Sequence, residues 1–181
     1  MTPLESPSVS APGSYVWGPL SGLGLSAALV TALLDQASKF WVLYVYDLKA
    51  KGALHVAPFL DFVLTWNKGI SYGLFQQEGP AGQWALLAFK AAAVVFLWAW
   101  LARTTTRLTA VSLGLIIGGA IGNSVDRLFH GAVADFVLLH LTTANFSFQW
   151  YVFNLADTAI VAGVIGLLYD SLWSHSAAKA P

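Results

Sequence analysis

The sequence predicts a membrane α-helical protein, with four transmembrane helices and a small extracytoplasmic β-sheet or hairpin that caps them. Of the 181 residues, 57% are hydrophobic and only 10% are charged, and the mean hydropathy is +0.65. A typical soluble domain has about 25% charged residues. Four segments have the roughly 20 mostly apolar residues that a spanning helix needs: Leu20 to Val45, Trp84 to Leu101, Leu108 to Phe129 and Leu155 to Trp173.

Tryptophans support the ends of these segments, because an indole ring can stay in the membrane interface while its N–H contacts water. We expect one four-helix domain over residues 20–173, a disordered tail over residues 1–19 and a short tail over residues 174–181. Residues 1–16 have no Lys or Arg and so lack the basic start of a cleavable signal peptide; cleavage after Ala11 is the alternative. The tryptophans are Trp17, Trp41, Trp84, Trp98, Trp100, Trp150 and Trp173.

Charge and composition narrow the function classes. The net charge is zero without a block of like charge, which argues against a nucleic-acid partner. The chain has no cysteine, so disulfides, thiolate catalysis and Cys-ligated metals are excluded. The four histidines do not have metal-ligand spacing, and P-loop, GxSxG and HExxH motifs are absent from the sequence. We therefore expect no metal and no cofactor.

The loop charges give a weak orientation signal. Arg103 and Arg107 lie in the short connection between the second and third segments, which favours placing that loop and both termini in the cytoplasm. Lys49, Lys51 and Lys68 in the first connection oppose this assignment.

Two regions outside the spans have β-strand character. The segment His55 to Phe75 follows a helix-breaking stretch, has Pro58 at the expected strand start and is rich in β-formers. The segments Val133 to Leu141 and Phe146 to Phe153 flank the four-residue link TTAN and predict a β-hairpin. Both regions lie on the same side of the membrane, so they can form one small sheet over the helices.

The predicted hairpin brings two aspartates together. If Leu141 pairs with Phe146, the antiparallel register places Asp135 opposite Val152, five residues before Asp157. Structural roles also fit these residues. Asn154 can be the N-cap of a helix in which Asp157 is the third residue, as in a capping box. Asp135 can likewise be a carboxylate at a strand end whose only role is to accept structural hydrogen bonds. Spacing leaves both the catalytic and the structural interpretation open.

Ionisable groups within apolar spans are costly, and they are candidates for functional sites. Asp35 and Lys39 are four residues apart, in the acid-before-base order that favours an ion pair on one helix face. Asn123, Asp126 and Arg127 share a face at the end of the third segment. Arg127 can hold a carboxylate or a lipid phosphate, and helix-terminal hydrogen bonding is the structural alternative.

The other polar and small residues of the spans have structural interpretations. Gly114, Gly118 and Gly122 repeat every four residues, a pattern that lets another helix approach closely. We expect Lys90 to extend along the second span to the membrane surface, and Asp170 to mark the exit of the fourth span.

Three function classes fit these features. Paired carboxylates near a membrane surface suit a hydrolytic enzyme, whereas intramembrane Asp and Lys residues also occur in proton- or ion-coupled carriers. A carrier predicts inverted repeats or broken helices at the bilayer midplane, which the sequence does not show. The third class is a non-enzymatic scaffold whose polar residues hold helices together.

Five ordered motifs resemble those of bacterial lipoprotein signal peptidases, also called signal peptidase II. They are DQASK, NKG, GNSVDR, GAVADF and FNLADT, and the resemblance extends over roughly residues 20 to 173. One departure follows the NKG motif, where the family has Ala and an aromatic residue such as Phe. This chain has Ser71 and Tyr72 there, a difference that concerns the shape of the substrate pocket.

The resemblance implies an aspartic endopeptidase of the bacterial inner membrane, with its active site near the extracytoplasmic face. Such an enzyme removes the signal peptide from a prolipoprotein just before its diacylglyceryl-modified cysteine. Its partners are these substrates and membrane lipids, it needs no metal or cofactor, and we expect a monomer. The implied catalytic residues are Asp135 and Asp157, and the implied substrate-binding or supporting residues are Asp35, Lys39, Asn67, Gly69, Asn123, Asp126, Arg127 and Asn154.

Overall fold

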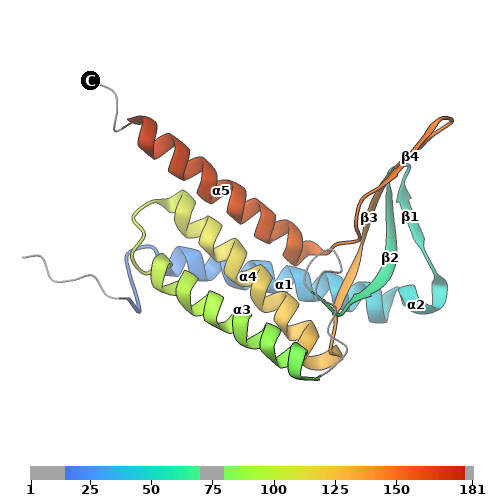
Figure 1. Cartoon of the computed structure of the whole chain (residues 1–181), viewed down its shortest axis with the longest axis horizontal. Coiled ribbons are helices and arrows are strands. Elements are labelled where there is room, and N and C mark those ends of the chain that lie inside the picture. Colours follow the sequence, from blue (N-terminus) through green and yellow to red (C-terminus); the bar gives the residue numbers. More distant parts are fainter. Residues whose placement is uncertain (1–14, 70–79, 178–181) are drawn as a thin grey trace, which may run out of the picture.

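Four long helices lie side by side and a small β-sheet stands at one end of them (Figure 1). The computed structural model describes residues 15–69 and 80–177. The long helices are α1 (Ser21–Phe40), α3 (Pro80–Leu101), α4 (Arg107–His130) and α5 (Leu155–Ala177). Helix α4 is central, because α1, α3 and α5 all pack against it.

The first helix turns toward the sheet through two short elements. Helix α1 continues into η1 (Trp41–Val45), a π-helical turn, and then into α2 (Leu48–Lys51). Asp47 has the left-handed φ of 57° and caps α2 by accepting a hydrogen bond from the Ala50 N–H. This reversal leads the chain into the first strand.

The β-sheet has four antiparallel strands in the order β1-β2-β3-β4. They are β1 (Leu54–Ala57), β2 (Leu60–Asn67), β3 (Val133–Thr143) and β4 (Phe146–Gln149). The prediction that both β regions join one sheet is confirmed. Pro58, however, lies in the turn between β1 and β2 and not at a strand start. Residues 70–75 of the predicted segment lie outside the described residues.

The predicted hairpin register is wrong by two residues. Leu141 pairs with Phe148, not with Phe146, and the connecting turn is only residues 144–145. Asp135 pairs with Thr65 of β2 and not with Val152. Two-residue connections are the commonest in hairpins, so the strands extend further toward the tip than a four-residue link allows. Because side chains alternate along a strand, a shift of two residues leaves each side chain on its predicted face.

Among the residues that the structure describes, three helices are long and apolar enough to cross a membrane: Ala81–Leu101 within α3, Arg107–His130 (α4), and Leu155–Leu172 within α5. They match three of the four predicted spans. The other predicted span, Leu20 to Val45, corresponds to α1 and η1. Its Asp35, Gln36 and Lys39 make it more polar, so the count of four spans stays a prediction.

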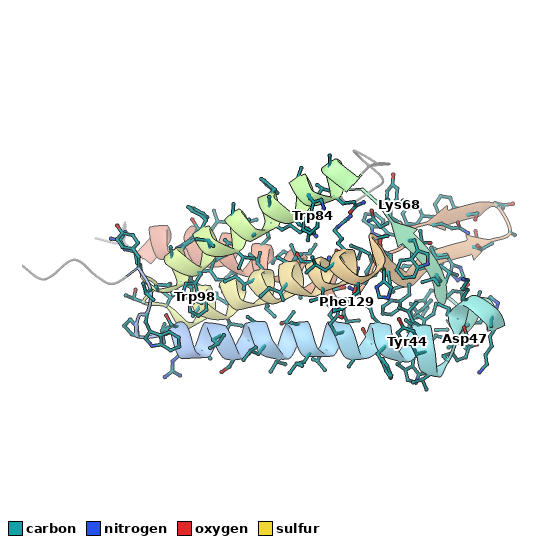
Figure 2. The ribbon with its side chains drawn as sticks, turned by 90° about the horizontal axis from the view of Figure 1, so that it is seen from below. Tyr44, Asp47, Lys68, Trp84, Trp98 and Phe129 are labelled. Carbon is teal, nitrogen blue, oxygen red and sulfur yellow. The ribbon has the colours of Figure 1, made fainter. Side chains whose placement is uncertain are left out.

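Aromatic residues lie at both ends of the helices, as the sequence predicts. Trp98 lies toward the end away from the sheet, where its indole N–H donates to the Val16 carbonyl at 2.9 Å (Figure 2). Tyr44 and Lys68 lie toward the sheet (Figure 2). The side chain of Trp173 lies outside the described residues.

The glycine stripe of α4 lets α1 approach closely. A Cβ atom at Gly114 or Gly118 would overlap backbone atoms of α1, and one at Gly122 would lie 2.5 Å from an Asp35 carboxylate oxygen. Beside this contact Ala28 joins a buried cluster with Leu101, Ala110, Leu113 and Ile117. The predicted packing role of the stripe is confirmed.

We predict that Gly118→Ala lowers the free energy of unfolding by about 1–3 kcal/mol, because the added methyl group forces α1 and α4 apart. Gly22→Ala is the matched control: a Cβ there meets nothing within 4 Å, and alanine raises helix stability by up to about 1 kcal/mol. Unfolding in detergent micelles measures both variants. Equal melting behaviour would contradict close packing at Gly118.

Candidate active site

Every residue of the candidate site that the sequence predicts lies where the helices meet the sheet. Asp135 comes from β3, and Asp157 from the first turn of α5. These two side chains and Asn67, at the end of β2, line one cavity of about 200 Å³. Residues from α1, from α4 and from the segments next to β2 and α5 support this cavity. The supporting residues are Asp35, Lys39, Gly69, Asn123, Asp126, Arg127 and Asn154.

Two asparagine amides connect the two candidate aspartates, and a third contacts Asp135. Asn154 Nδ2 donates to Asp135 Oδ1 at 2.6 Å and to Asn123 Oδ1 at 3.1 Å. Asn123 Nδ2 in turn donates to Asp157 Oδ1 at 2.9 Å. Asn67 Nδ2 donates to the other Asp135 oxygen at 3.1 Å. Each carboxylate is therefore oriented by neutral donors.

The predicted capping box is present at the start of α5. The Asp157 N–H donates to Asn154 Oδ1 at 3.0 Å, and the Asn154 N–H donates to Asp157 Oδ2 at 3.4 Å. The carboxylate therefore lies in the first turn of α5, close to the free N–H groups of the helix N-terminus. The cap contacts one Asp157 oxygen and Asn123 contacts the other, so both oxygens of this carboxylate are held in place.

The surroundings of Asp135 favour its protonated form. Burial, together with the negative charge of Asp157, raises the pKa of Asp135 to about 6. The hydrogen bonds from Asn67 and Asn154 oppose the shift and lower the pKa. A carboxyl group with this pKa can retain a proton close to neutral pH.

A buried ion cluster lies beneath the two aspartates. Lys39 Nζ is 2.8 Å from Asp35 Oδ2 and 2.8 Å from Asp126 Oδ2, and it donates to Asn123 Oδ1 at 3.0 Å. The three charged side chains are at most 4% exposed. A buried charge is tolerated only with close partners, and Lys39 has two. The predicted Asp35–Lys39 pair is thus part of a larger cluster that joins α1 to α4.

The same cluster holds the backbone next to each candidate aspartate. Asp126 Oδ2 accepts a hydrogen bond from the N–H of Ala134 at 3.1 Å, and Ala134 precedes Asp135. Asp35 Oδ1 accepts one from the N–H of Ala156 at 3.0 Å, and Ala156 precedes Asp157. The positions of both aspartates therefore depend on one cluster.

Gln36 is a member of the site that the sequence did not predict. Its Nε2 donates to Asp126 Oδ1 at 2.9 Å and to the Gly122 carbonyl at 3.1 Å. The available signal was an amide side chain within an apolar helical segment, next to Asp35. Gln36 adds a second link between α1 and α4.

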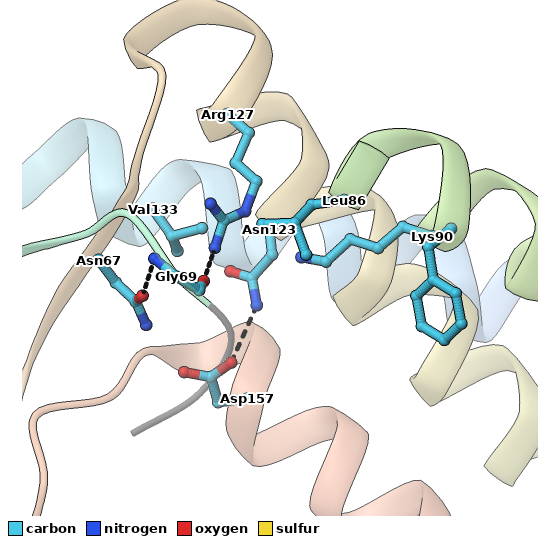
Figure 3. Close-up of a pocket in the computed structure, with 9 residues that line it drawn as sticks. Asn67, Gly69, Leu86, Lys90, Asn123, Arg127, Val133 and Asp157 are labelled. Atoms are coloured by element: carbon cyan, nitrogen blue, oxygen red, sulfur yellow. Dashed lines mark hydrogen bonds between the residues drawn. The ribbon is translucent and has the colours of Figure 1, made fainter. Parts of the chain in front are cut away.

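Arg127 holds the chain that follows β2. Its Nη2 donates to the Gly69 carbonyl (Figure 3). Its Nη1 donates to Gln83 Oε1 at 3.2 Å. The Gly69 N–H donates to Asn67 Oδ1 at 3.0 Å, which connects this contact to the cavity. The partners of Arg127 are thus a backbone carbonyl and a side-chain amide oxygen. Ser71 and Tyr72 lie outside the described residues.

A second cavity of about 110 Å³ adjoins the first, and Asn67 and Asp157 line both. Lys90 of α3 also lines it, with its side chain directed toward Asn123 of α4 (Figure 3). The sequence predicts only that Lys90 extends to the membrane surface. Its position in the wall of the site depends on how α3 packs against α4.

We predict that Arg127→Lys destabilises the protein by roughly 1.5–3 kcal/mol, because an ammonium group cannot reach both the Gly69 carbonyl and Gln83. Arg107→Lys is the matched control, since Arg107 is exposed at the start of the same helix. Unfolding in detergent micelles measures the loss. An Arg127→Lys variant as stable as Arg107→Lys would contradict the anchoring role.

Comparisons with known proteins agree with this architecture. A family model described as Signal peptidase (SPase) II matches residues 27–173. A lipoprotein signal peptidase of Nitrobacter hamburgensis is 59% identical over 158 residues, which cover 87% of this chain and 96% of that protein. One of Rhodopseudomonas palustris is 57% identical over 159 residues, which cover 88% and 97%.

The fold also has a solved counterpart. A structure described as a bacterial membrane enzyme superposes with a TM-score of 0.72 at 23% identity and covers 88% of this chain and 92% of its own. The family resemblance that the five motifs predict is confirmed by the family model and the close relatives. On these matches, the chain belongs to the signal peptidase II family.

Proposed function

We propose that this protein is an aspartic endopeptidase that removes the signal peptide from prolipoproteins just before the diacylglyceryl-modified cysteine. The family and the names of its close relatives support the substrate. The observation that carries the mechanism is that Asp135 and Asp157 line one cavity and are linked through the amides of Asn154 and Asn123.

In the proposed reaction, the two carboxylates share one proton. Ionised Asp157 takes a proton from a water molecule, whose oxygen forms a bond to the scissile carbonyl carbon. Protonated Asp135 donates to the carbonyl oxygen as charge develops there. The tetrahedral intermediate then returns that proton, the C–N bond breaks and the proton taken by Asp157 moves to the departing amine. The apparent pKa values belong to the pair of carboxylates and not to either residue. We propose that the state with Asp135 protonated and Asp157 ionised is the dominant one.

The assignment of roles follows from the surroundings of each carboxylate. Asp135 is buried, with its pKa raised to about 6, which suits the proton donor. Asp157 lies at a helix N-terminus, where the helix dipole stabilises a negative charge, and this suits the base. Supporting roles go to Asn67 and Asn154, which orient Asp135, and to the cluster around Lys39, which positions both.

We place the sheet and the site at the extracytoplasmic face of the inner membrane. The connection containing Arg103 lies at the opposite end of the helices from the sheet (Figure 1), and arginine-rich loops favour the cytoplasm. Helix α1 is the fourth span in this arrangement. Its outward face is apolar and exposed, as expected for contact with lipid; it includes Leu23, Leu29, Val30, Leu33 and Leu34. We propose that residues 20–173 form one domain that acts as a monomer.

We predict that Asp135→Asn and Asp157→Asn each abolish cleavage of a diacylglyceryl-modified precursor. Asparagine is nearly isosteric with aspartate but cannot accept a proton from water or share one. The double variant should be hardly worse than either single variant, because the two groups act as one unit. Product formation is measured on protein whose melting temperature remains close to that of the wild type.

Asp47→Asn is the matched control, since Asp47 is an exposed helix cap that Asn replaces well. It should cleave at the wild-type rate. Substantial turnover by either variant of the pair would remove that aspartate from the mechanism. A wild-type protein that releases no shortened product would favour a carrier or a scaffold instead.

We also predict that Asp157→Asn lowers the pKa of Asp135 below about 6. Removing a nearby negative charge makes ionisation of Asp135 easier, while its burial is unchanged. Carboxyl ¹³C chemical shifts, or the infrared carboxyl band, followed through a pH titration measure this change. Asp47→Asn should leave the pKa of Asp135 unchanged. An unchanged pKa in Asp157→Asn would show that the two carboxylates do not interact.

A further inference from the structure

Lys90 lies between two cavities of different character. On one side is the cavity of about 110 Å³ that it shares with Asn123, Arg127 and Asp157. On the other side is a cavity of about 350 Å³ between α3 and α4. Lys90 lines both, so its ammonium group stands where a polar site meets an apolar space.

The cavity between α3 and α4 suits a hydrocarbon chain. Its rim is open to the surroundings, because Trp84 is 66% and Leu128 is 60% exposed. Along α3 it extends from Trp84 to Val94, about 15 Å at 1.5 Å per residue. The Ser124 hydroxyl in its wall already donates to the Ala120 carbonyl at 2.6 Å. The remaining lining residues, apart from Lys90, are Leu87, Ala91, Ile121 and Val125.

Lys90 lacks a hydrogen bond or ion pair to any other residue that the structure describes. The charged groups that face it are Arg127, Asp157, Lys39 and Asp126. Both carboxylates already have other partners: Asp126 binds Lys39, and Asp157 accepts from Asn123. A half-buried ammonium group with three donors therefore has capacity for an acceptor from a ligand.

A neutral carbonyl oxygen is the acceptor that fits this position. A phosphate would place two or three anionic oxygens in the cavity that Asp157 also lines, and like charges there repel. A carbonyl oxygen accepts a hydrogen bond from Lys90 and adds no net charge. The ligand must then carry an acyl chain on one side of this carbonyl and reach the candidate aspartates on the other.

We infer that Lys90 binds an ester carbonyl of the substrate's diacylglyceryl group, with the attached acyl chain in the cavity between α3 and α4. This inference rests on the proposed function, and it assigns to that function a specificity residue and a lipid subsite. The thioether-linked cysteine then lies next to the aspartates, because Lys90 and Asp157 line the same cavity. The enzyme would in this way recognise the lipid before it cleaves the peptide.

The test compares two substrates with two variants. One precursor peptide carries the diacylglyceryl group, and the other carries a dialkyl ether analogue with equal chains but no ester carbonyl. Lys90→Met should raise KM for the ester substrate about tenfold, the value of one hydrogen bond to a charged group. It should not alter KM for the ether substrate. Lys90→Arg, which keeps the charge, should retain most of the ester affinity.

The apolar subsite is tested by filling it. Ala91→Phe places a ring in the cavity and should raise KM for long acyl chains but not for short ones. Ala92→Phe is the matched control, because Ala92 is exposed on the same helix and does not line the cavity. If neither variant raises KM more for long acyl chains than for short ones, the acyl chain does not bind in this cavity and the proposed subsite is contradicted.

Binding to the inactive Asp135→Asn protein separates this inference from the proposed function. Fluorescence titration with the ester and ether peptides gives Kd without turnover, and Lys90→Met in this background should weaken only ester binding. Equal effects of Lys90→Met on both peptides, or none on either, would overturn the ester contact even if the wild type cleaves normally. If the wild-type protein binds the ester peptide through Lys90 but never cleaves it, the proposed peptidase function is contradicted and the inferred lipid subsite is supported.

Discussion

The buried ammonium group of Lys39 is the interaction on which the rest of the site depends. It holds Asp35 of α1 and Asp126 of α4 at 2.8 Å each. The other oxygen of Asp35 accepts a hydrogen bond from a backbone N–H at the start of α5, and Asp126 Oδ2, the oxygen that contacts Lys39, also accepts one near the start of β3. One cation thus fixes four elements, and the two candidate aspartates each follow directly after a fixed N–H. Removing Lys39 would leave two buried carboxylates without their counter-charge, which is far more costly than losing an exposed ion pair.

Close helix packing is what makes this cluster possible. Gly122 has no side chain, and a Cβ atom there would lie 2.5 Å from the Asp35 carboxylate. Gly114 and Gly118 bring the α1 backbone against α4 along the preceding turns. The resulting contact excludes solvent from the ions and strengthens their attraction. The small-residue stripe and the charged residues of the first span are therefore two parts of one structural requirement: ions can be buried here because the helices approach closely enough to surround them.

Local rules predict much of this architecture, and long-range packing decides the rest. The apolar segments, the i,i+4 pair of Asp35 and Lys39 and the Asn154–Asp157 cap each depend on neighbours within one turn, and the sequence predicts them correctly. The hairpin register depends on the true length of a turn, and TTAN allows either two or four connecting residues. Gln36 and Lys90 acquire their positions from α4, which is distant in sequence. Their residue types alone, an amide and a lysine in apolar helices, also fit simpler roles.

The choice of donors around the two aspartates explains how the pKa of Asp135 stays raised although Lys39 and Arg127 are nearby. Asn67 and Asn154 donate to Asp135 without bringing a positive charge, so they orient the carboxylate and lower its pKa less than a direct cation contact would. Lys39 is held between two other carboxylates, and Arg127 binds a backbone carbonyl. Burial and the charge of Asp157 therefore outweigh the lowering effects of Lys39 and of the two amides, and the pKa of Asp135 stays raised to about 6. The amides contact the carboxylates and the cations lie behind them, so the site has the rigidity of an ion cluster and Asp135 keeps the raised pKa that the proposed acid–base mechanism requires.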